Sequence, residues 1–210
     1  MKNHPLYSDP SLVELTTKML MAQGKTTLQI YQYGESEAEH AKILLDALNL
    51  PENAKVLSLG CGVGGMEAHW KKLRPDLQFT LVNNSREQLN LCLCEGERVC
   101  QDLQEFEAYP EYNCVILAYV LGHVDPKQAL AVANRCLLPG GMLLINDLFE
   151  GSEAFNESFF YDSPSFEIID EFAAKSFYLF YPIPVERLSI IPDFPLPVEA
   201  FPGVFILQKS

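Results

Sequence analysis

Short apolar runs alternate along the middle of the chain with stretches whose apolar residues recur every three or four positions. A nearly continuous apolar run is typical of a buried strand, and a three-to-four spacing predicts a helix with one buried face. Five strands are therefore expected, at 55–59, 79–82, 98–101, 112–119 and 142–146. Helices are expected between them at 66–73, at 85–94 and from Asp125 onward. This alternation predicts an α/β fold, a single-domain three-layer sandwich with a doubly wound, mostly parallel sheet.

Two helices are expected before the first strand. Each opens with a capping box, at 11–14 and at 36–39, and they end near Gly24 and before Pro51. After the fifth strand the character changes, because aromatic residues are dense from 155 to 181. A helix at 165–175, a strand at 177–181, a proline-rich connection and a last strand at 203–208 are expected there. We divide the chain into N-terminal helices at 1–50 and a main domain at 51–210, together forming one compact unit.

Composition limits the class of protein. The chain has 210 residues, of which 48% are hydrophobic and 20% charged, an ordinary globular mixture. Its apolar runs are too short to cross a bilayer and its first residues lack a signal-peptide core, so a cytoplasmic location is expected. The net charge of −13 argues against nucleic acid and anionic membranes as partners. The four histidines and six cysteines show no metal-ligand or redox spacing, so no metal and reduced, structural thiols are expected.

A glycine-rich loop, Gly60-Cys61-Gly62-Val63-Gly64-Gly65, directly follows the first strand. In open parallel sheets, ligands bind outside the carboxyl ends of the strands, and glycines let a ligand approach the main chain closely. A tight turn without a ligand is the simpler alternative. The spacing also satisfies the G-x-G-x-x-G pattern of dinucleotide-binding proteins, so the loop alone does not choose between cofactors.

Three features weigh against a nicotinamide cofactor. Two helices precede the first strand, whereas a dinucleotide fold commonly begins with it. The second strand ends in Asn83 rather than in the acid that binds the NAD ribose. The sheet also ends soon after its fifth strand, which leaves little room for a separate substrate domain.

Three segments together resemble the class I S-adenosylmethionine-dependent methyltransferases. They are the first strand with its loop (56–65), the fourth strand with Leu121-Gly122-His123-Val124, and Leu137-Leu138-Pro139-Gly140-Gly141-Met142. The resemblance covers roughly residues 30–150. It implies a Rossmann-like, seven-stranded sheet with a reversed last strand, S-adenosylmethionine as cofactor and S-adenosylhomocysteine as product.

The same resemblance implies a set of cofactor-binding residues at the strand ends. They are Tyr33, Gly60, Cys61, Gly62, Gly64, Asn83, Asn84, Gln88, Asp102, Leu103, Ala118 and Tyr119. The glycine backbone would pass against the methionine and ribose, Asn83 would meet the ribose hydroxyls, and Asp102 with Leu103 would lie by the adenine. The end of the fourth strand would lie near the methionine.

Two residues depart from the family pattern. The family usually has an acid where this chain has Ser58, and another where it has Asn83. An amide accepts ribose hydrogen bonds with less charge assistance than a carboxylate, so cofactor binding weaker by roughly 1–2 kcal/mol is expected. The departures also keep open a degenerate methyltransferase fold that serves as a binding or partner protein.

The segments 83–89 and 31–34 resemble the sterol and terpenoid methyltransferase branch, in which Tyr33 would reach the cofactor. Methyl transfer needs alignment and exclusion of water, and a base only if the acceptor must lose a proton. His123, at the mouth of the sheet, is the candidate base, and the alternative is that it only caps or packs the turn before Asp125. The aromatic segment, with Tyr161 and Asp162, is a candidate wall for a small apolar or aromatic substrate, or simply core. A homodimer stays open.

Overall fold

The computed structural model describes residues 9–24, 26, 36–150, 178–182 and 200–209. Its strands form one sheet in the order β3-β2-β1-β4-β5-β7-β6. They are β1 (Lys55–Leu59), β2 (Gln78–Asn83), β3 (Glu97–Cys100), β4 (Tyr112–Ala118), β5 (Leu137–Glu150), β6 (Tyr178–Pro182) and β7 (Ala200–Gln208). The first five strands are mutually parallel, and β7 is antiparallel to both β5 and β6. The predicted mostly parallel sheet with a reversed last strand is therefore confirmed.

The order of strands reverses between β1 and β4. The chain moves outward from β1 through β2 to β3 and then returns to the other side of β1. Parallel neighbours end at the same edge, and open sheets of this kind bind ligands where the order of strands reverses. We call the region outside the carboxyl ends of β1 and β4 the crevice. The glycine loop follows β1 at this point.

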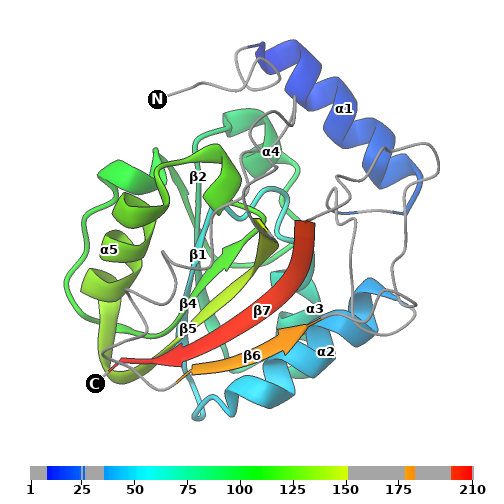
Figure 1. The fold of residues 1–210 in the computed structure, drawn as a ribbon. Coiled ribbons are helices and arrows are strands. Elements are labelled where there is room, and N and C mark those ends of the chain that lie inside the picture. The colour runs from blue at the N-terminus through cyan, green and yellow to red at the C-terminus, as the bar shows by residue number, and fades with distance from the viewer. Residues whose placement is uncertain (1–8, 25, 27–35, 151–177, 183–199, 210) are drawn as a thin grey trace.

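Helices cover both faces of the sheet (Figure 1). They are α1 (Pro10–Ala22), α2 (Glu37–Leu48), α3 (Gly65–Leu73), α4 (Arg86–Asn90) and α5 (Pro126–Cys136). Leu44 of α2 and Trp70 of α3 share one core cluster with Val56 of β1, while Leu130 of α5 shares the opposite cluster with Leu57. Successive strand residues alternate between faces, so the nearly continuous apolar strands supply both clusters.

Several predicted boundaries change in the structure. The helix expected to open with the capping box at 11–14 begins earlier, because Asp9 is its N-cap and accepts from the Ser11 and Leu12 amides. The helix expected at 85–94 ends at Asn90. Residues 139–141, expected to form the turn before the fifth strand, lie inside a longer β5 that pairs irregularly with β4. The helix expected at 165–175 lies outside the described residues.

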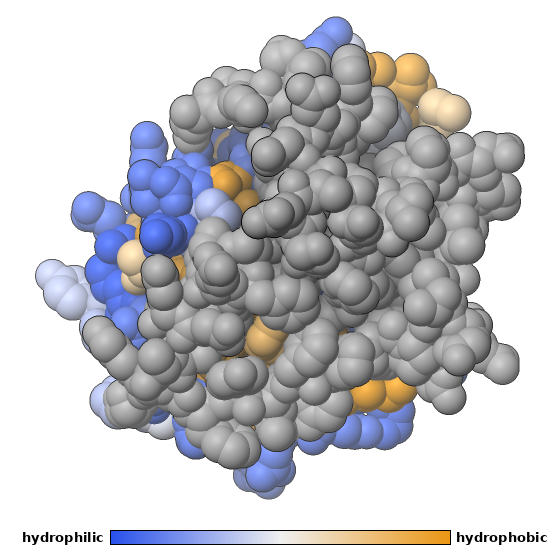
Figure 2. All heavy atoms as spheres, viewed as in Figure 1, coloured by the Kyte–Doolittle hydropathy of each residue, from blue (hydrophilic) through white to orange (hydrophobic). Residues whose placement is uncertain are grey.

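The visible surface differs from one end of the molecule to the other. Hydrophilic residues gather over α5, and apolar surface appears over α1, whose Leu12, Leu15 and Met19 are exposed (Figure 2). Within the described ranges, each helix is too short or too polar to cross a membrane.

Candidate functional site

The glycine loop takes a backbone path that side chains would obstruct. Gly60, Gly62 and Gly64 have φ angles of 77°, 56° and 64°, in the left-handed region that favours glycine. A Cβ at Gly60 would lie 2.6 Å from a Val120 methyl group, and one at Gly64 would lie 2.8 Å from the Cys92 sulfur. Among the described residues, no atom would lie within 4 Å of a Cβ at Gly62. The loop is thus packed at both ends and open in the middle, which suits close approach of a ligand to the Gly62 backbone.

The loop leads directly into a helix. Gly64 is the N-cap of α3 and makes no side-chain capping bond, so the first amides of α3 receive no capping oxygen from it. The other end of the loop is fixed, because the Gly60 and Cys61 amides both donate to the Val82 carbonyl of β2, at 2.8 and 3.0 Å. A rigid loop that ends in helix amides is suited to polar or anionic ligand groups.

Asn83, at the carboxyl end of β2, holds the loop from the side. Its Nδ2 donates to the Gly62 carbonyl at 3.3 Å and to the Gln88 Oε1 at 2.9 Å. A carboxylate at this position has no hydrogens to donate to either oxygen. The departure from the family pattern therefore gives the loop a support that an acid could not provide.

Ser58, the other departure, also has a partner that the sequence did not reveal. Its hydroxyl donates to the Glu67 carboxylate of α3 at 2.5 Å, and the Glu67 side chain is buried, with 3% of its surface exposed. Burial raises the pKa of Glu67, and the Ser58 hydrogen bond opposes that rise. An acid is therefore present beneath the glycine loop, supplied by the helix instead of the strand.

The end of β4 forms the second wall of the crevice. Tyr119 follows Ala118 with a φ of 54°, uncommon for a residue with a side chain, and its amide donates to the Asn146 carbonyl at 2.8 Å. The next turn is held by Asp147 of β5, because one carboxylate oxygen accepts from the Val120 and Leu121 amides at 3.1 and 3.0 Å. The strained turn is thereby fixed against the glycine loop.

His123 lies two residues after Leu121, at the end of a short 3-10 helix, Leu121–His123. Its amide donates to the Val120 carbonyl at 2.9 Å, and its Nδ1 is buried. The residue therefore belongs to the turn that Asp147 braces.

The remaining predicted cofactor residues are spread along the same edge. Asp102 caps a 3-10 helix by accepting from the Gln104 amide at 2.9 Å, and Leu103 packs into the core. Asn84 is exposed, and Tyr33 lies outside the described residues. Asp102 and Leu103 follow β3, whose neighbour is β2, so they lie on the same side of the crevice as Asn83.

A buried polar pair joins α2 to the sheet on the other side of the crevice. His40 of α2 and Asn146 of β5 contact each other at 2.9 Å, between Nε2 and Nδ2. Burial lowers the pKa of His40 to about 4, so the ring is neutral at pH 7 and its Nε2 accepts from the amide. The Asn146 Oδ1 is buried and has no hydrogen-bond partner among the described residues.

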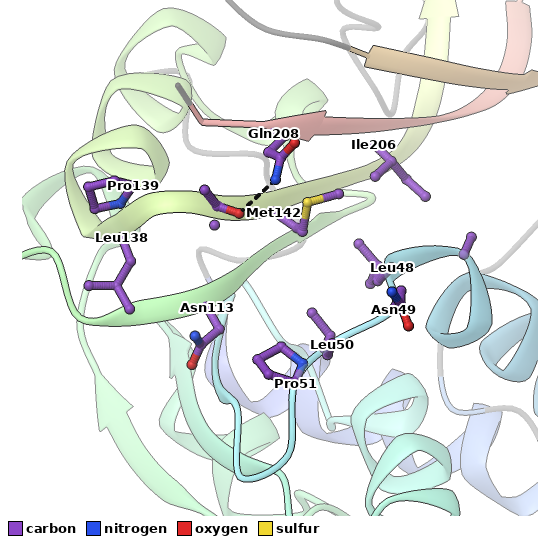
Figure 3. Close-up of a pocket in the computed structure, with 13 residues that line it drawn as sticks. Leu48, Asn49, Leu50, Pro51, Asn113, Leu138, Pro139, Met142, Ile206 and Gln208 are labelled. Carbon is purple, nitrogen blue, oxygen red and sulfur yellow. Dashed lines mark hydrogen bonds between the residues drawn. The ribbon is translucent and has the colours of Figure 1, made fainter.

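A hollow of about 380 Å³ lies at the opposite edge of the sheet (Figure 3). Its lining includes Leu50 and Pro51 before β1, Asn113 at the start of β4 and Met142 of β5. The Gln208 side chain donates to the Gly140 carbonyl at its rim, at 3.2 Å. This hollow is separated from the glycine loop by the length of the strands, and the buried groups described above do not line it.

Sequence reasoning therefore brought together the glycine loop, Asn83, Gln88, Ala118 and Tyr119, all at one edge of the sheet. It missed four buried polar residues that support this edge: His40, Glu67, Asn146 and Asp147. Asp147 offered a signal, because a carboxylate that follows a buried strand is suited to capping a neighbouring turn. The local pattern of the sequence gives no such signal for His40, Glu67 or Asn146.

Comparison with known proteins places this geometry in a family. The family described as a methyltransferase domain matches residues 32–177, more than half of the chain. The cyclopropane-fatty-acyl-phospholipid synthase of Escherichia coli (strain K12) is 30% identical over 113 residues, 51% of this chain and 29% of that protein. The probable (S)-tetrahydroprotoberberine N-methyltransferase 2 of Papaver bracteatum is 23% identical over 156 residues, 70% of this chain and 41% of that protein. The chain thus spans less than half the length of the curated relatives it matches.

Solved structures agree on the fold. The [4+2]-cyclase SpnF has a TM-score of 0.75 at 14% identity, covering 95% of this chain and 94% of that chain. The Haemonchus contortus phosphoethanolamine N-methyltransferase 2, in complex with phosphomonomethylethanolamine and S-adenosylhomocysteine, has a TM-score of 0.75 at 16% identity, covering 99% and 59%. At such low identity these likenesses show the fold, whereas the match over residues 32–177 shows the family. The chain belongs to the methyltransferase domain family.

Proposed function

We propose that this protein binds S-adenosylmethionine over the glycine loop and transfers its methyl group to a small apolar or aromatic molecule, releasing S-adenosylhomocysteine. The observation that carries the proposal is the open backbone at Gly62, between two glycines whose Cβ positions are blocked. It lies at the reversal of strand order, where this class of sheet binds ligands. A nicotinamide-dependent oxidoreductase receives no support from the family match.

Asn83 would bind the ribose with its oxygen. Its amide hydrogens are used on Gly62 and Gln88, so Oδ1 is the atom left to accept from a ribose hydroxyl. One neutral acceptor replaces the two charged oxygens of an acid, and an affinity lower by roughly 1–2 kcal/mol follows. The loss is partial because the same side chain holds the loop in place.

The other contacts follow from position along the carboxyl edge. Asp102 and Leu103, beyond β3, would lie by the adenine, with Asn84 and Cys61 completing the nucleoside side. Ala118 and Tyr119, next to the loop, would lie by the methionine. We assign residues 1–50 as helices that cover this site and 51–210 as the methyltransferase domain, with Tyr33 reaching the cofactor. The hydrogen bond from Gln88 to Thr17 of α1, at 3.4 Å, supports such a cover.

His123 would act as the base when the acceptor must lose a proton. It stands on the turn after β4, which Asp147 holds through two backbone amides, so its position relative to the methionine end of the site is fixed. The cofactor supplies a methyl group already activated by its sulfonium. The protein's own contribution is to align the acceptor with that methyl group and exclude water.

A second candidate is a methyltransferase fold that binds the cofactor or another small molecule without transferring a methyl group. Two observations favour it: the changes at Ser58 and Asn83, and the structural likeness to a protein named as a [4+2]-cyclase. It predicts ligand binding with no labelled product.

Calorimetry with S-adenosylmethionine, S-adenosylhomocysteine and NAD separates these candidates. The proposal expects heat with the first two ligands and none with NAD. Gly62→Ala should weaken the affinity about tenfold or more, because the added methyl group enters the ligand's space. Gly140→Ala is the matched control: its φ of 74° imposes similar backbone strain, its Cβ would lie 4.0 Å from Gln208, and it stands at the opposite edge. No heat with either adenosyl ligand at low salt would overturn the proposal.

Transfer itself is tested with methyl-labelled cofactor and small-molecule extracts. A labelled product identifies the acceptor, and its absence despite binding favours the second candidate. His123→Ala should lower turnover while leaving the affinity for S-adenosylhomocysteine unchanged. An equal loss in both would place His123 in cofactor binding or in the structure of the turn instead.

A further inference from the structure

A chain of side-chain hydrogen bonds connects α1 to the glycine loop. The Gln88 Nε2 of α4 donates to the Thr17 Oγ1 of α1 at 3.4 Å, and the Gln88 Oε1 accepts from the Asn83 Nδ2 at 2.9 Å. The same Asn83 nitrogen donates to the Gly62 carbonyl at 3.3 Å. Thr17 and Asn83, at the two ends of this chain of side chains, are both buried. A helix that is remote along the sequence is therefore connected to the open backbone of the site.

Gly62 sets the direction of every bond in this chain. A carbonyl oxygen accepts and never donates, so the Asn83 amide must present its Nδ2 to Gly62. The Gln88 atom that faces this nitrogen is then the oxygen, and the Gln88 Nε2 is left to donate to the Thr17 hydroxyl. The reverse order would bring the Asn83 oxygen against the Gly62 oxygen. The chain thus fixes Asn83 in the orientation that leaves its Oδ1 unoccupied by these partners.

α1 rests on α4 through a small buried face. The two helices lie side by side, and α4 is the main neighbour of α1 among the described elements (Figure 1). Val13 and Thr17 are the buried residues of α1, whereas Leu12, Leu15 and Met19 are exposed. Because so few side chains of α1 are buried, a single polar contact contributes substantially to holding the helix in place. The hydrogen bond between Thr17 and α4 is such a contact.

We propose that Thr17 and Gln88 are positioning residues for the cofactor: they hold Asn83 with its Oδ1 toward the ribose and make the docking of α1 part of the binding affinity. The family resemblance implies a direct contact between Gln88 and the cofactor, but both polar atoms of its side-chain amide contact protein instead. The inference rests on the proposed function, to which the ribose contact of Asn83 belongs. By thermodynamic linkage, a cofactor that favours this orientation of Asn83 also favours the docking of α1.

Calorimetry with S-adenosylhomocysteine tests the positioning. Thr17→Val keeps the shape of the side chain and removes the acceptor, and it should weaken binding about twofold to threefold because the lost bond is long. Gln88→Met removes both bonds and should weaken binding about threefold to tenfold. Thr16→Val, at the preceding residue of α1, is the matched control and should bind like wild type. Wild-type affinity in both Thr17→Val and Gln88→Met would overturn the proposal.

A double-mutant cycle separates positioning from direct contact. If Gln88 acts through Asn83, Gln88→Met should cost little further affinity in an Asn83→Ala background. Circular dichroism and a thermal melt check that each variant folds. Additive losses of affinity would mean that Gln88 contacts the cofactor itself, and would overturn its positioning role.

Hydrogen–deuterium exchange of the α1 amides gives a second readout, one that a direct contact between Gln88 and the cofactor would not produce. In the free protein, Thr17→Val and Gln88→Met should speed this exchange, and Thr16→Val should not. Saturating S-adenosylhomocysteine should slow the exchange in wild type but not in Gln88→Met. Equal exchange in wild type with and without bound ligand would overturn the coupling. If wild type binds no adenosyl ligand, the proposed function fails, while exchange in the free protein still decides whether Thr17 and Gln88 hold α1.

Discussion

Two buried polar pairs interrupt the same apolar layer of the sheet, one at each side of the crevice. Ser58 of β1 meets Glu67 of α3, and Asn146 of β5 meets His40 of α2. Ser58 and Asn146 lie two positions after Val56 and Leu144, which belong to the core cluster under α2 and α3, so all four strand residues face those helices. Both pairs tie a helix to the carboxyl edge of the sheet.

Burial shifts the two ionisable partners in opposite directions because it disfavours whichever form is charged. It raises the pKa of Glu67, so this residue contributes stability at low pH that is lost as pH rises through the raised pKa. It lowers the pKa of His40 to about 4, so this residue contributes stability above its ordinary pKa that is lost as pH falls. Acid therefore lowers the stability contributed by the pair on the β5 side of the crevice, and not that contributed by the pair on the glycine-loop side.

The largest expected effect is the acid sensitivity of His40. Its pKa is 6.5 in the unfolded chain and about 4 in the folded one. Between these values the unfolded state binds more protons, so the free energy of unfolding falls as pH falls, by roughly 3 kcal/mol from pH 6.5 to 4. Urea unfolding across this range should show the loss in wild type and most of it removed in His40→Gln.

His69→Gln is the matched control for this prediction. Burial and the Lys72 charge also lower the pKa of His69, but that residue is only partly buried and lies on α3. The variant should therefore retain nearly all of the acid sensitivity of wild type. If His40→Gln and wild type lose the same free energy of unfolding between pH 6.5 and 4, a group other than His40 causes the acid sensitivity.

Ser58→Ala is expected to have the next largest effect. It removes the hydroxyl that donates to Glu67 and leaves a buried carboxylate oxygen without that partner, at a cost of about 1–3 kcal/mol in the free energy of unfolding. The same change should raise the pKa of Glu67 further, because the Ser58 hydrogen bond lowers it.

A double-mutant cycle isolates the Ser58–Glu67 interaction. In the Glu67→Leu background, Ser58→Ala should lower the free energy of unfolding much less than it does in wild type. The reason is that no buried carboxylate is then left without its hydrogen-bond partner. Urea unfolding of the four proteins at pH 7 gives the coupling. Additive losses would mean that Ser58 supports β1 independently of Glu67.

The sequence predicts features that depend on neighbouring residues better than features that depend on residues far apart along the chain. The strands, the glycine loop and the N-cap at Asp125 depend on neighbouring residues, and the structure has each of them in the predicted region, although β5 and β7 are longer than predicted. The start of α1 moved because Asp9 and Pro10 form a stronger helix start than Ser11. Such errors change a boundary and leave the architecture intact.

The supporting pairs could not be predicted because their partners are remote along the chain. His40 and Asn146 are 106 positions apart. His40 lies among the apolar residues of a predicted helix, and the sequence alone does not show which residue it contacts. In the sequence, Glu67 is an ordinary acidic residue in the first turn of a predicted helix, and Ser58 stands where the family usually has an acid. Only their contact across nine positions shows that one residue compensates for the other.

The smallest expected effect comes from Asn146→Leu. The change removes the hydrogen bond to His40, but it also removes a buried amide oxygen that has no partner among the described residues, so the two consequences partly cancel. A net loss of about 1 kcal/mol or less in the free energy of unfolding is expected at pH 7, smaller than for Ser58→Ala. Urea unfolding of both variants, measured side by side, makes the comparison. A loss at Asn146 that exceeds the loss at Ser58 would mean that its oxygen has a partner in the folded chain, and that the β5 pair is as fully satisfied as the pair beneath the glycine loop.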